Sequence, residues 1–157
     1  NGQRIIDVNI TFTAEYADCV LGDKKDAGFS VRIATSMDVD SKKGGSIINS
    51  NGITDKAAWG RRAAWVDYHG PVNGKTVGVA ILNHPSSFRH PTPWHVRTYG
   101  LFTANPFGLR SLRQGEDGSF TLKKGKSITL KHRVIFHKGD EKSAKIADAY
   151  KAYASEK

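Results

Sequence analysis

The chain has 157 residues, 38% of them hydrophobic and 10% aromatic, which is enough material for one domain with a substantial core. Its longest apolar stretches have the length of strands, so no segment of the sequence could cross a bilayer as a helix. Lys and Arg total 24 against 15 Asp and Glu, a formal net charge of +9, but the lysines gather in expected turns without the interleaved aromatic residues of a nucleic-acid surface.

Alternation between apolar and polar residues predicts a series of antiparallel strands. In chain order the alternating runs cover residues 6–12, 29–33, 77–81 and 128–136, the last interrupted at His132. Between these runs, clusters rich in Gly, Asp, Asn and Lys predict turns. The turn clusters occupy residues 22–28, 40–46, 70–75, 115–118 and 123–126.

Residues 140–156 carry the only helical pattern in the sequence. Their Ile146, Ala149 and Tyr153 fall on one face of a helix. Many short strands followed by one terminal helix are typical of a β-sandwich. We therefore predict an all-β fold, an antiparallel β-sandwich that forms a single domain over residues 1–157, with a short C-terminal helix.

Two stretches in the first 60 residues carry weaker signals. Residues 42–60 are rich in Gly and Ser and lack periodicity, so we expect a long loop that covers a site. Cys19 is the only cysteine, which excludes an intrachain disulfide and a cysteine-based zinc cage. Because Cys19 lies in a strand-like stretch, EYADCVL, we expect a buried, inert thiol rather than a nucleophile.

The segment 83–107 interrupts the alternation and concentrates polar and aromatic side chains. It holds four of the five prolines in the chain. Proline fixes φ and removes a backbone donor, so this density predicts an irregular but rigid stretch. Side chains held by a stiff backbone lose less entropy on binding, and we therefore expect the working surface of the protein here.

Three interpretations compete for the histidines of this segment. His84, His90 and His95 could form a metal triad, although their spacing matches no compact ligand motif. One of them could act as a general acid or base, because an imidazole titrates near neutral pH. Alternatively, the histidines tie down the proline-rich loop through hydrogen bonds to backbone carbonyls.

Aromatic residues beside Arg, Asn, Asp and His suggest a carbohydrate site, because sugar C–H faces stack on rings while hydroxyls need planar polar partners. Core packing is the alternative for each aromatic ring. Among the carboxylates, Asp26 lies in a turn beside two lysines, and Asp67 lies on the inward phase of the run AAWVDYHG. The aromatic residues concerned are Trp59, Trp65, Tyr68, Trp94, Tyr99, Phe102 and Phe107.

These observations predict a carbohydrate-active domain that epimerises, cleaves or eliminates a sugar by acid–base chemistry of His90, His95 and Asp26. The alternatives are a non-catalytic carbohydrate-binding or assembly module, and a protein whose three histidines, His84 included, bind a transition metal such as copper. No other cofactor is predicted. The expected substrate-binding residues are Asn83, His84, Arg89, Trp94, Arg97, Asp67 and Tyr68.

Three blocks of the sequence resemble the C-terminal half of a bacterial family of unknown function that is often labelled PmoA-like. The blocks cover residues 21–37, 65–108 and 118–140, and the strings HPSSFRHPTPWHVR and ANPFG are the most specific. The resemblance implies a galactose-mutarotase-like β-supersandwich, a carbohydrate-related role and a periplasmic or secreted location. The membrane-bound monooxygenase that the label suggests does not fit a chain without a predicted membrane span.

The resemblance also implies that this chain is one half of a larger supersandwich. Either the chain is a fragment of a longer protein, or a second chain supplies the N-terminal half. The expected ligand is a carbohydrate, whereas a membrane or a nucleic acid is not expected. Related mutarotases pair a histidine with a carboxylate across their cleft. The resemblance implies that role for His84, His90 or His95 with Asp26, although this chain offers no obvious glutamate there.

Overall fold

The computed structural model describes residues 2–156, which contain ten strands, two 3₁₀ helices and one α-helix. No helix among these residues is both long and apolar enough to span a membrane. The helices are η1 (Thr35–Met37), η2 (Asp55–Ala58) and α1 (Ile146–Ala154). The strands are β1 (Arg4–Thr13), β2 (Cys19–Leu21), β3 (Phe29–Arg32), β4 (Ser46–Asn49), β5 (Trp65–Val72), β6 (Lys75–Asn83), β7 (Trp94–Val96), β8 (Leu101–Ala104), β9 (Phe120–Leu122) and β10 (Ser127–Lys138).

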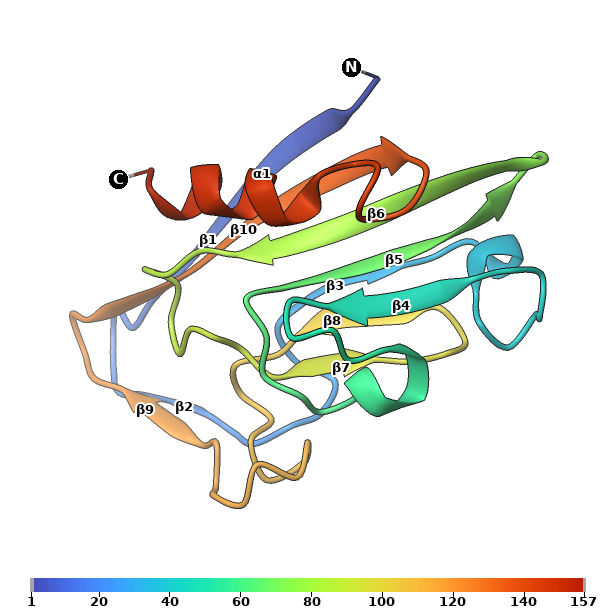
Figure 1. The fold of residues 1–157 in the computed structure, drawn as a ribbon. Helices are drawn as coiled ribbons and strands as arrows, with labels where there is room; N and C mark the ends of the chain where they lie inside the picture. The colour runs from blue at the N-terminus through green and yellow to red at the C-terminus, as the bar shows by residue number, and fades with distance from the viewer. Residues whose placement is uncertain (1, 157) are drawn as a thin grey trace.

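The strands form three antiparallel sheets (Figure 1). The largest has five strands in the order β1-β10-β6-β5-β4, the second has three in the order β3-β8-β7, and β2 pairs with β9. The three-stranded sheet lies against one face of the five-stranded sheet, and α1 lies against the other face (Figure 1). The predicted mostly-β fold with a short C-terminal helix is confirmed.

The centre of the molecule is the hairpin of β5 and β6, which is buried on both faces. On one face, Val66 and Ile81 pack with Phe102 of the three-stranded sheet. On the other face, Leu82 packs with Ile146 of α1. Alternate residues of a strand point to opposite faces, so this hairpin contributes to two cores at once. These two cores connect the five-stranded sheet to the three-stranded sheet on one side and to α1 on the other.

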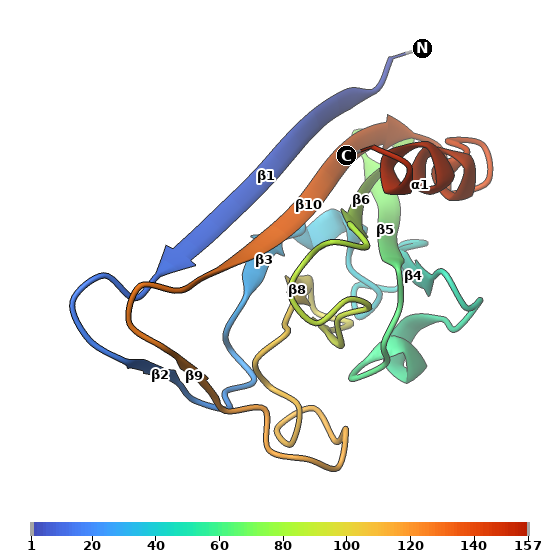
Figure 2. The same cartoon turned by 90° about the vertical axis from the view of Figure 1, so that its left-hand side faces the viewer.

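β1 is an edge strand, and its only neighbour in the sheet is β10. The two strands pair along the whole length of β1, with Val8 opposite His132. Figure 2 shows β1 along the outer side of β10, with its end near the β2–β9 pair. Ile5 and Ile6 remain 53% and 52% exposed, because no layer covers this end of the strand.

The C-terminal helix is shorter than the predicted segment 140–156. The side chain of Asp140 accepts hydrogen bonds from the backbone N–H and the hydroxyl of Ser143, which closes a turn instead of starting a helix. Lys145, immediately before α1, has a φ of 55°, a left-handed conformation that no helix interior tolerates. The regular helix therefore begins only at Ile146.

The expectation of an unstructured loop over residues 42–60 is wrong in part, because β4 and η2 both lie within it. β4 reads SIIN, with two adjacent isoleucines, so its sequence shows no apolar–polar alternation. The side-chain oxygen of Asn49 accepts the backbone N–H groups of Asn51 and Ile53, 3.0 Å from each nitrogen. That contact closes the tight turn after the strand.

The expectation of a buried thiol at Cys19 is also wrong, since this cysteine is exposed. β2 is a three-residue strand that pairs only with β9. No other sheet covers this pair, and the neighbouring Val20 is 69% exposed. The apolar residues that suggested a buried strand here belong to a surface ribbon.

His132 does not interrupt β10, which runs without a break from Ser127 to Lys138. Its ring is buried between the sheets and stacks on Phe29, with the ring centroids 5.3 Å apart. Among the described residues, neither ring nitrogen has a hydrogen-bond partner. Burial lowers the pKa of His132 to about 4, because the charged form would be desolvated.

The turn at residues 22–28 is fastened to the rest of the protein by Asn105, which is fully buried. Its amide nitrogen donates to the carbonyl oxygens of Lys24 and Lys25, each at 2.8 Å. Its side-chain oxygen accepts the backbone N–H groups of Phe107 and Gly108 at 2.9 and 3.0 Å. One amide group therefore joins two loops that are distant in sequence.

We predict that acid destabilises the protein through His132. The unfolded imidazole binds a proton near pH 6.5 and the folded one only near pH 4, so the unfolded chain binds more protons between these values. The free energy of unfolding should fall by about 3 kcal/mol as the pH drops through this window. Below the window, the contribution of His132 no longer changes with pH. Urea denaturation at several pH values measures this fall in the free energy of unfolding. His132→Phe keeps an aromatic ring on Phe29 but cannot titrate, and an unchanged pH slope in this variant would contradict the prediction.

We predict that Asn105→Asp destabilises the fold at neutral pH. The substitution is nearly isosteric, but it replaces the donor that faces Lys24 and Lys25 with an oxygen that repels both carbonyls. A loss of about 3 kcal/mol is expected in urea denaturation, the usual effect of a buried unpaired charge. Asn9→Asp, at an exposed position of β1, is the matched control. Equal stability of the two variants would refute the assignment.

Candidate functional site

The largest of the well-defined cavities, with a volume of about 630 Å³, lies beside the turn that joins β7 to β8. Small-molecule sites commonly have volumes of this order. Two of its walls are aromatic, Trp59 just after η2 and Tyr99 in the turn. We call it the arginine–aromatic pocket. Its lining residues are Asp40, Lys56, Trp59, Val96, Arg97, Thr98, Tyr99 and Arg113.

Two guanidinium groups lie over these aromatic rings at cation–π distance. The central carbon of the Arg97 guanidinium lies 5.9 Å from the ring centroid of Trp59 and 5.3 Å from that of Tyr99. The corresponding carbon of Arg113 lies 5.5 Å from the centroid of Trp59. Stacking orients a guanidinium while leaving its N–H edge available. The ion pairs within residues 2–156 involve neither group, so both can engage a ligand.

The backbone of the turn is held rigidly from below. Tyr68, on β5, donates its hydroxyl hydrogen to the carbonyl oxygen of Thr98 at 3.0 Å. Burial raises the pKa of Tyr68 to about 12, so the hydroxyl stays protonated. Gly100 closes the turn at a φ of +89°, and a Cβ there would meet the carbonyl oxygen of Ile33 at 3.0 Å. Tyr68, predicted to bind substrate, instead supports the turn that carries Arg97 and Tyr99.

Trp94, the predicted stacking platform, is completely buried. Its ring packs between the sheets, 5.8 Å from the ring of Phe102, and its indole N–H donates to the carbonyl oxygen of Ala63 at 2.9 Å. No face of the ring is open to a ligand in this structure. Trp94 is therefore a core residue, which is the alternative that the sequence left open for every aromatic ring.

His84 and His95 donate hydrogen bonds to backbone carbonyl oxygens, as the alternative of histidines that tie down the loop expects. The Nε2–H of His84 donates to the carbonyl oxygen of Glu156 at 3.1 Å, which anchors the end of the C-terminal segment. The Nδ1–H of His95 donates to the carbonyl oxygen of Lys25 at 2.8 Å. Asp26 lies 3.7 Å from the same nitrogen, but its side chain is 70% exposed. The structure thus brings His95 and Asp26 together with the histidine ring buried.

His90 and Asn83 form a second pair within the segment. The Nδ1–H of His90 donates to the side-chain oxygen of Asn83 at 3.0 Å, and that oxygen also accepts the backbone N–H of Thr92. Burial lowers the pKa of His90, so the ring is neutral near pH 7. The Tyr150 hydroxyl lies 3.5 Å from its other ring nitrogen. None of the better-formed cavities is lined by His90.

Arg89, another predicted binding residue, fastens loops together. One of its terminal nitrogens donates to the carbonyl oxygens of Pro106 and Gly118. Its guanidinium also lies over the rings of Phe88 and Phe120. Of the predicted binding residues, Arg97 alone lines the arginine–aromatic pocket.

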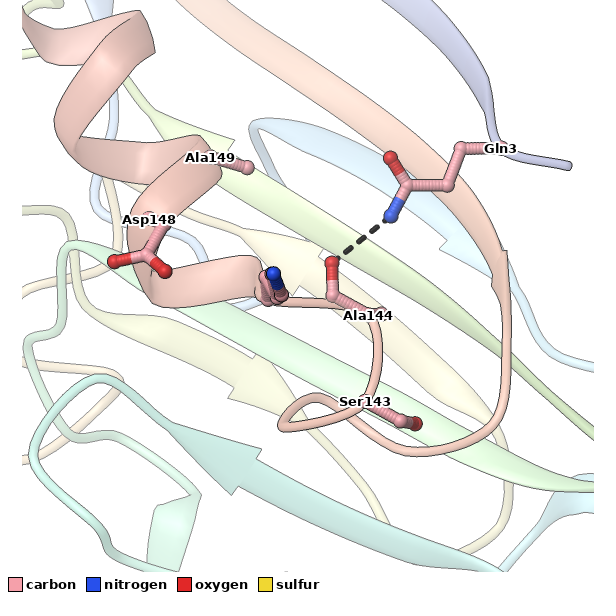
Figure 3. A pocket seen from close by; sticks show the side chains of 6 residues that line it. Gln3, Ser143, Ala144, Asp148 and Ala149 are labelled. Atoms are coloured by element: carbon pink, nitrogen blue, oxygen red, sulfur yellow. Dashed lines mark hydrogen bonds between the residues drawn. The ribbon is translucent and has the colours of Figure 1, made fainter. Parts of the chain in front are cut away.

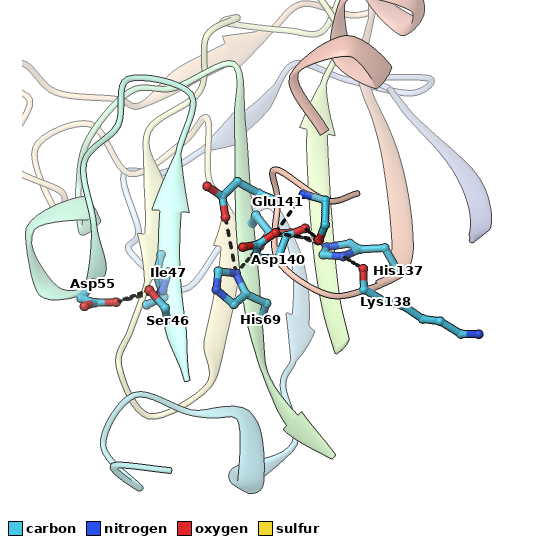
Figure 4. Close-up of polar contacts among 10 residues, drawn as sticks. Ser46, Ile47, Asp55, His69, His137, Lys138, Asp140 and Glu141 are labelled. Carbon is cyan, nitrogen blue, oxygen red and sulfur yellow. Dashed lines mark hydrogen bonds and ion pairs between the residues drawn. The ribbon is translucent and has the colours of Figure 1, made fainter. Parts of the chain in front are cut away.

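Asp67 belongs to a separate polar cluster on the face of β5 that points toward α1, the face of Trp65. Figure 4 shows His69, His137 and Glu141 of this cluster. The Asp67 carboxylate is fully buried and accepts a hydrogen bond from His137 Nε2 at 2.6 Å and from His69 Nδ1 at 2.7 Å. Glu141 lies 3.9 Å from the same His69 nitrogen. The hydrogen bond to Asp67 raises the pKa of His69. The spacing of residues 67 and 69 on one strand face could have indicated this pair, but no sequence pattern links His137 or Glu141 to it.

A smaller cavity of about 350 Å³ lies beside the start of α1 and has fewer side chains that could bind a ligand (Figure 3). The side-chain amide of Gln3 donates to the carbonyl oxygen of Ala144 at 2.9 Å across it. It has no aromatic wall, and its charged side chains are Lys145 and Asp148. The arginine–aromatic pocket is therefore the better candidate for ligand binding.

Comparison with known proteins gives a family but no activity. Neither the curated proteins nor the solved structures contain a match to this chain. A family model described as "Family of unknown function (DUF6807)" matches residues 1–151. That description names no reaction or ligand, so the resemblances to PmoA-like proteins and to mutarotases stay predictions. The chain belongs to this family of unknown function.

Proposed function

We propose that the arginine–aromatic pocket binds an acidic carbohydrate, such as a sugar that carries a carboxylate. The observation that carries the proposal is the pair of guanidinium groups, from Arg97 and Arg113, that lie over the ring of Trp59 within one cavity. Aromatic faces match the C–H faces of a sugar ring, and guanidinium groups match planar carboxylates through two parallel hydrogen bonds.

The charge of the pocket favours an anionic ligand over a neutral one. Arg97, Arg113 and Lys56 face a single carboxylate, that of Asp40. The pocket therefore carries an excess of positive charge, in line with the net charge of +9 for the chain. A neutral sugar would leave both guanidinium groups without a charged partner and would gain less from the site.

The lining also favours binding over glycoside hydrolysis. Hydrolysis of a glycosidic bond ordinarily requires two carboxyl groups on opposite sides of that bond. Among the lining residues, Asp40 is the only carboxylate, and none is a histidine. The groups expected to transfer protons, His90 and His95, line none of the better-formed cavities, and His95 is buried. We therefore favour a binding module, the non-catalytic alternative for this chain.

Calorimetric titration with a uronic-acid disaccharide and with its neutral counterpart tests the proposal. The acidic sugar should bind at least about tenfold more tightly, because charge-assisted hydrogen bonds to arginine contribute about 1.5–3 kcal/mol. Arg97→Gln should remove most of this preference. Trp59→Ala should weaken the binding of both disaccharides, because it removes the aromatic surface on which a sugar ring would stack.

Lys151→Gln is the matched control, since it removes one positive charge from an exposed position on α1. This variant should bind like the wild type. Equal affinity for the two disaccharides, or acidic-sugar binding that survives both pocket substitutions, would disprove the proposal. Tighter binding of a nucleoside monophosphate than of any uronate would instead assign the pocket to nucleotides.

A further inference from the structure

The polar cluster of Asp67, His69, His137 and Glu141 is not explained by carbohydrate binding, because it lies on the other side of the five-stranded sheet from the arginine–aromatic pocket. Residues 65, 67 and 69 point to the same face of β5, and Trp65 packs in the core beside α1. The cluster joins three separate parts of the chain: β5, β10 and the turn after β10 (Figure 4).

The contact between Asp67 on β5 and His137 on β10 reaches across β6, the strand that lies between them. His137 and His69 are both opposite Gly78 on β6. A Cβ at Gly78 would collide with the imidazole ring of His137. The ring therefore lies across the space that the glycine leaves open, and from there its Nε2–H reaches the Asp67 carboxylate.

Three of these side chains present ligand atoms to a common point. The nearest ligand atoms of Asp67, His69 and Glu141 all lie within 4.8 Å of one another. The His69 nitrogen is 2.7 Å from the Asp67 oxygen and 3.9 Å from the Glu141 oxygen. These distances lie on either side of the separation of about 3.3 Å between two ligands of a tetrahedral zinc ion.

We propose that Asp67, His69 and Glu141 bind a divalent transition-metal ion of the Zn²⁺ class. The proton that His69 Nδ1 shares with Asp67 would move to Nε2 or be released to solvent when the metal binds. That nitrogen and two carboxylate oxygens then supply three ligands and two negative charges, and a water molecule would complete the coordination. The imidazole ligand selects against Ca²⁺ and Mg²⁺, which take oxygen ligands.

The surroundings of the three ligands suit such an ion. The second oxygen of Asp67 accepts the hydrogen bond from His137, and contacts of this kind orient a carboxylate ligand and strengthen metal binding. The Asp67 side chain is fully buried, whereas those of His69 and Glu141 are 14% and 12% exposed. An ion can therefore reach the site from solvent on the side of these two residues.

Titration of untagged, chelator-treated protein with Zn²⁺ by calorimetry tests the site. We expect one ion per chain, with Ca²⁺ and Mg²⁺ at least about a hundredfold weaker. His69→Gln and Glu141→Gln should each weaken Zn²⁺ binding by about tenfold or more. Both positions are partly exposed, and neither change removes the buried pair of Asp67 and His137. Urea denaturation shows that each variant is folded before it is titrated.

His90→Gln controls for zinc bound by a histidine outside the cluster, and it should keep the wild-type affinity. The proposal is overturned if the wild type binds no stoichiometric Zn²⁺, or if either cluster variant binds it as tightly as the wild type does. It is also overturned if His90→Gln abolishes binding, or if Ca²⁺ or Mg²⁺ competes equally well.

Discussion

The burial of β5 on both faces is the constraint on which the rest of the structure depends. Neighbouring residues on this strand point in opposite directions, and each supports a different candidate site. Tyr68 points toward the three-stranded sheet and holds the turn of the arginine–aromatic pocket through the carbonyl oxygen of Thr98. Asp67 points toward α1 and organises the histidine–carboxylate cluster. A register shift of one residue would exchange these two side chains and abolish both sites.

The strands could be predicted from the sequence where one of their faces is more apolar than the other. The alternating runs at 6–12 and 128–136 lie within β1 and β10, which extend one or two residues further at each end. β4 was missed because its sequence, SIIN, places two isoleucines side by side and so shows no alternation, whereas the equally short β3, FSVR, alternates and was predicted. The length of the C-terminal helix was overestimated, because its start depends on the turn that Asp140 closes with Ser143. The periodicity of apolar residues contains no information about that turn.

The candidate sites were harder to predict, because composition shows which side chains are present but not where they point. Judged from the sequence, Trp94 and Trp59 are equally suitable for stacking on a sugar ring. In the structure, Trp94 packs in the core and Trp59 lines a cavity. Two histidines of segment 83–107, His84 and His95, contact backbone carbonyl oxygens of residues far away in sequence. The Asp67 cluster arises from the register of three strands and from the missing side chain of Gly78, and neither is visible locally.

The position of β1 at the margin of the large sheet has a consequence for how the protein fluctuates. β1 has one neighbouring strand, and the side chains at its start are about half exposed. Separating its first residues from β10 breaks ladder hydrogen bonds but uncovers little of the core built on β5 and β6. Local opening of this kind requires much less free energy than global unfolding. The amide hydrogens of this end of β1 therefore exchange with solvent through fraying, whereas those of β5 and β6 exchange only when the whole domain unfolds.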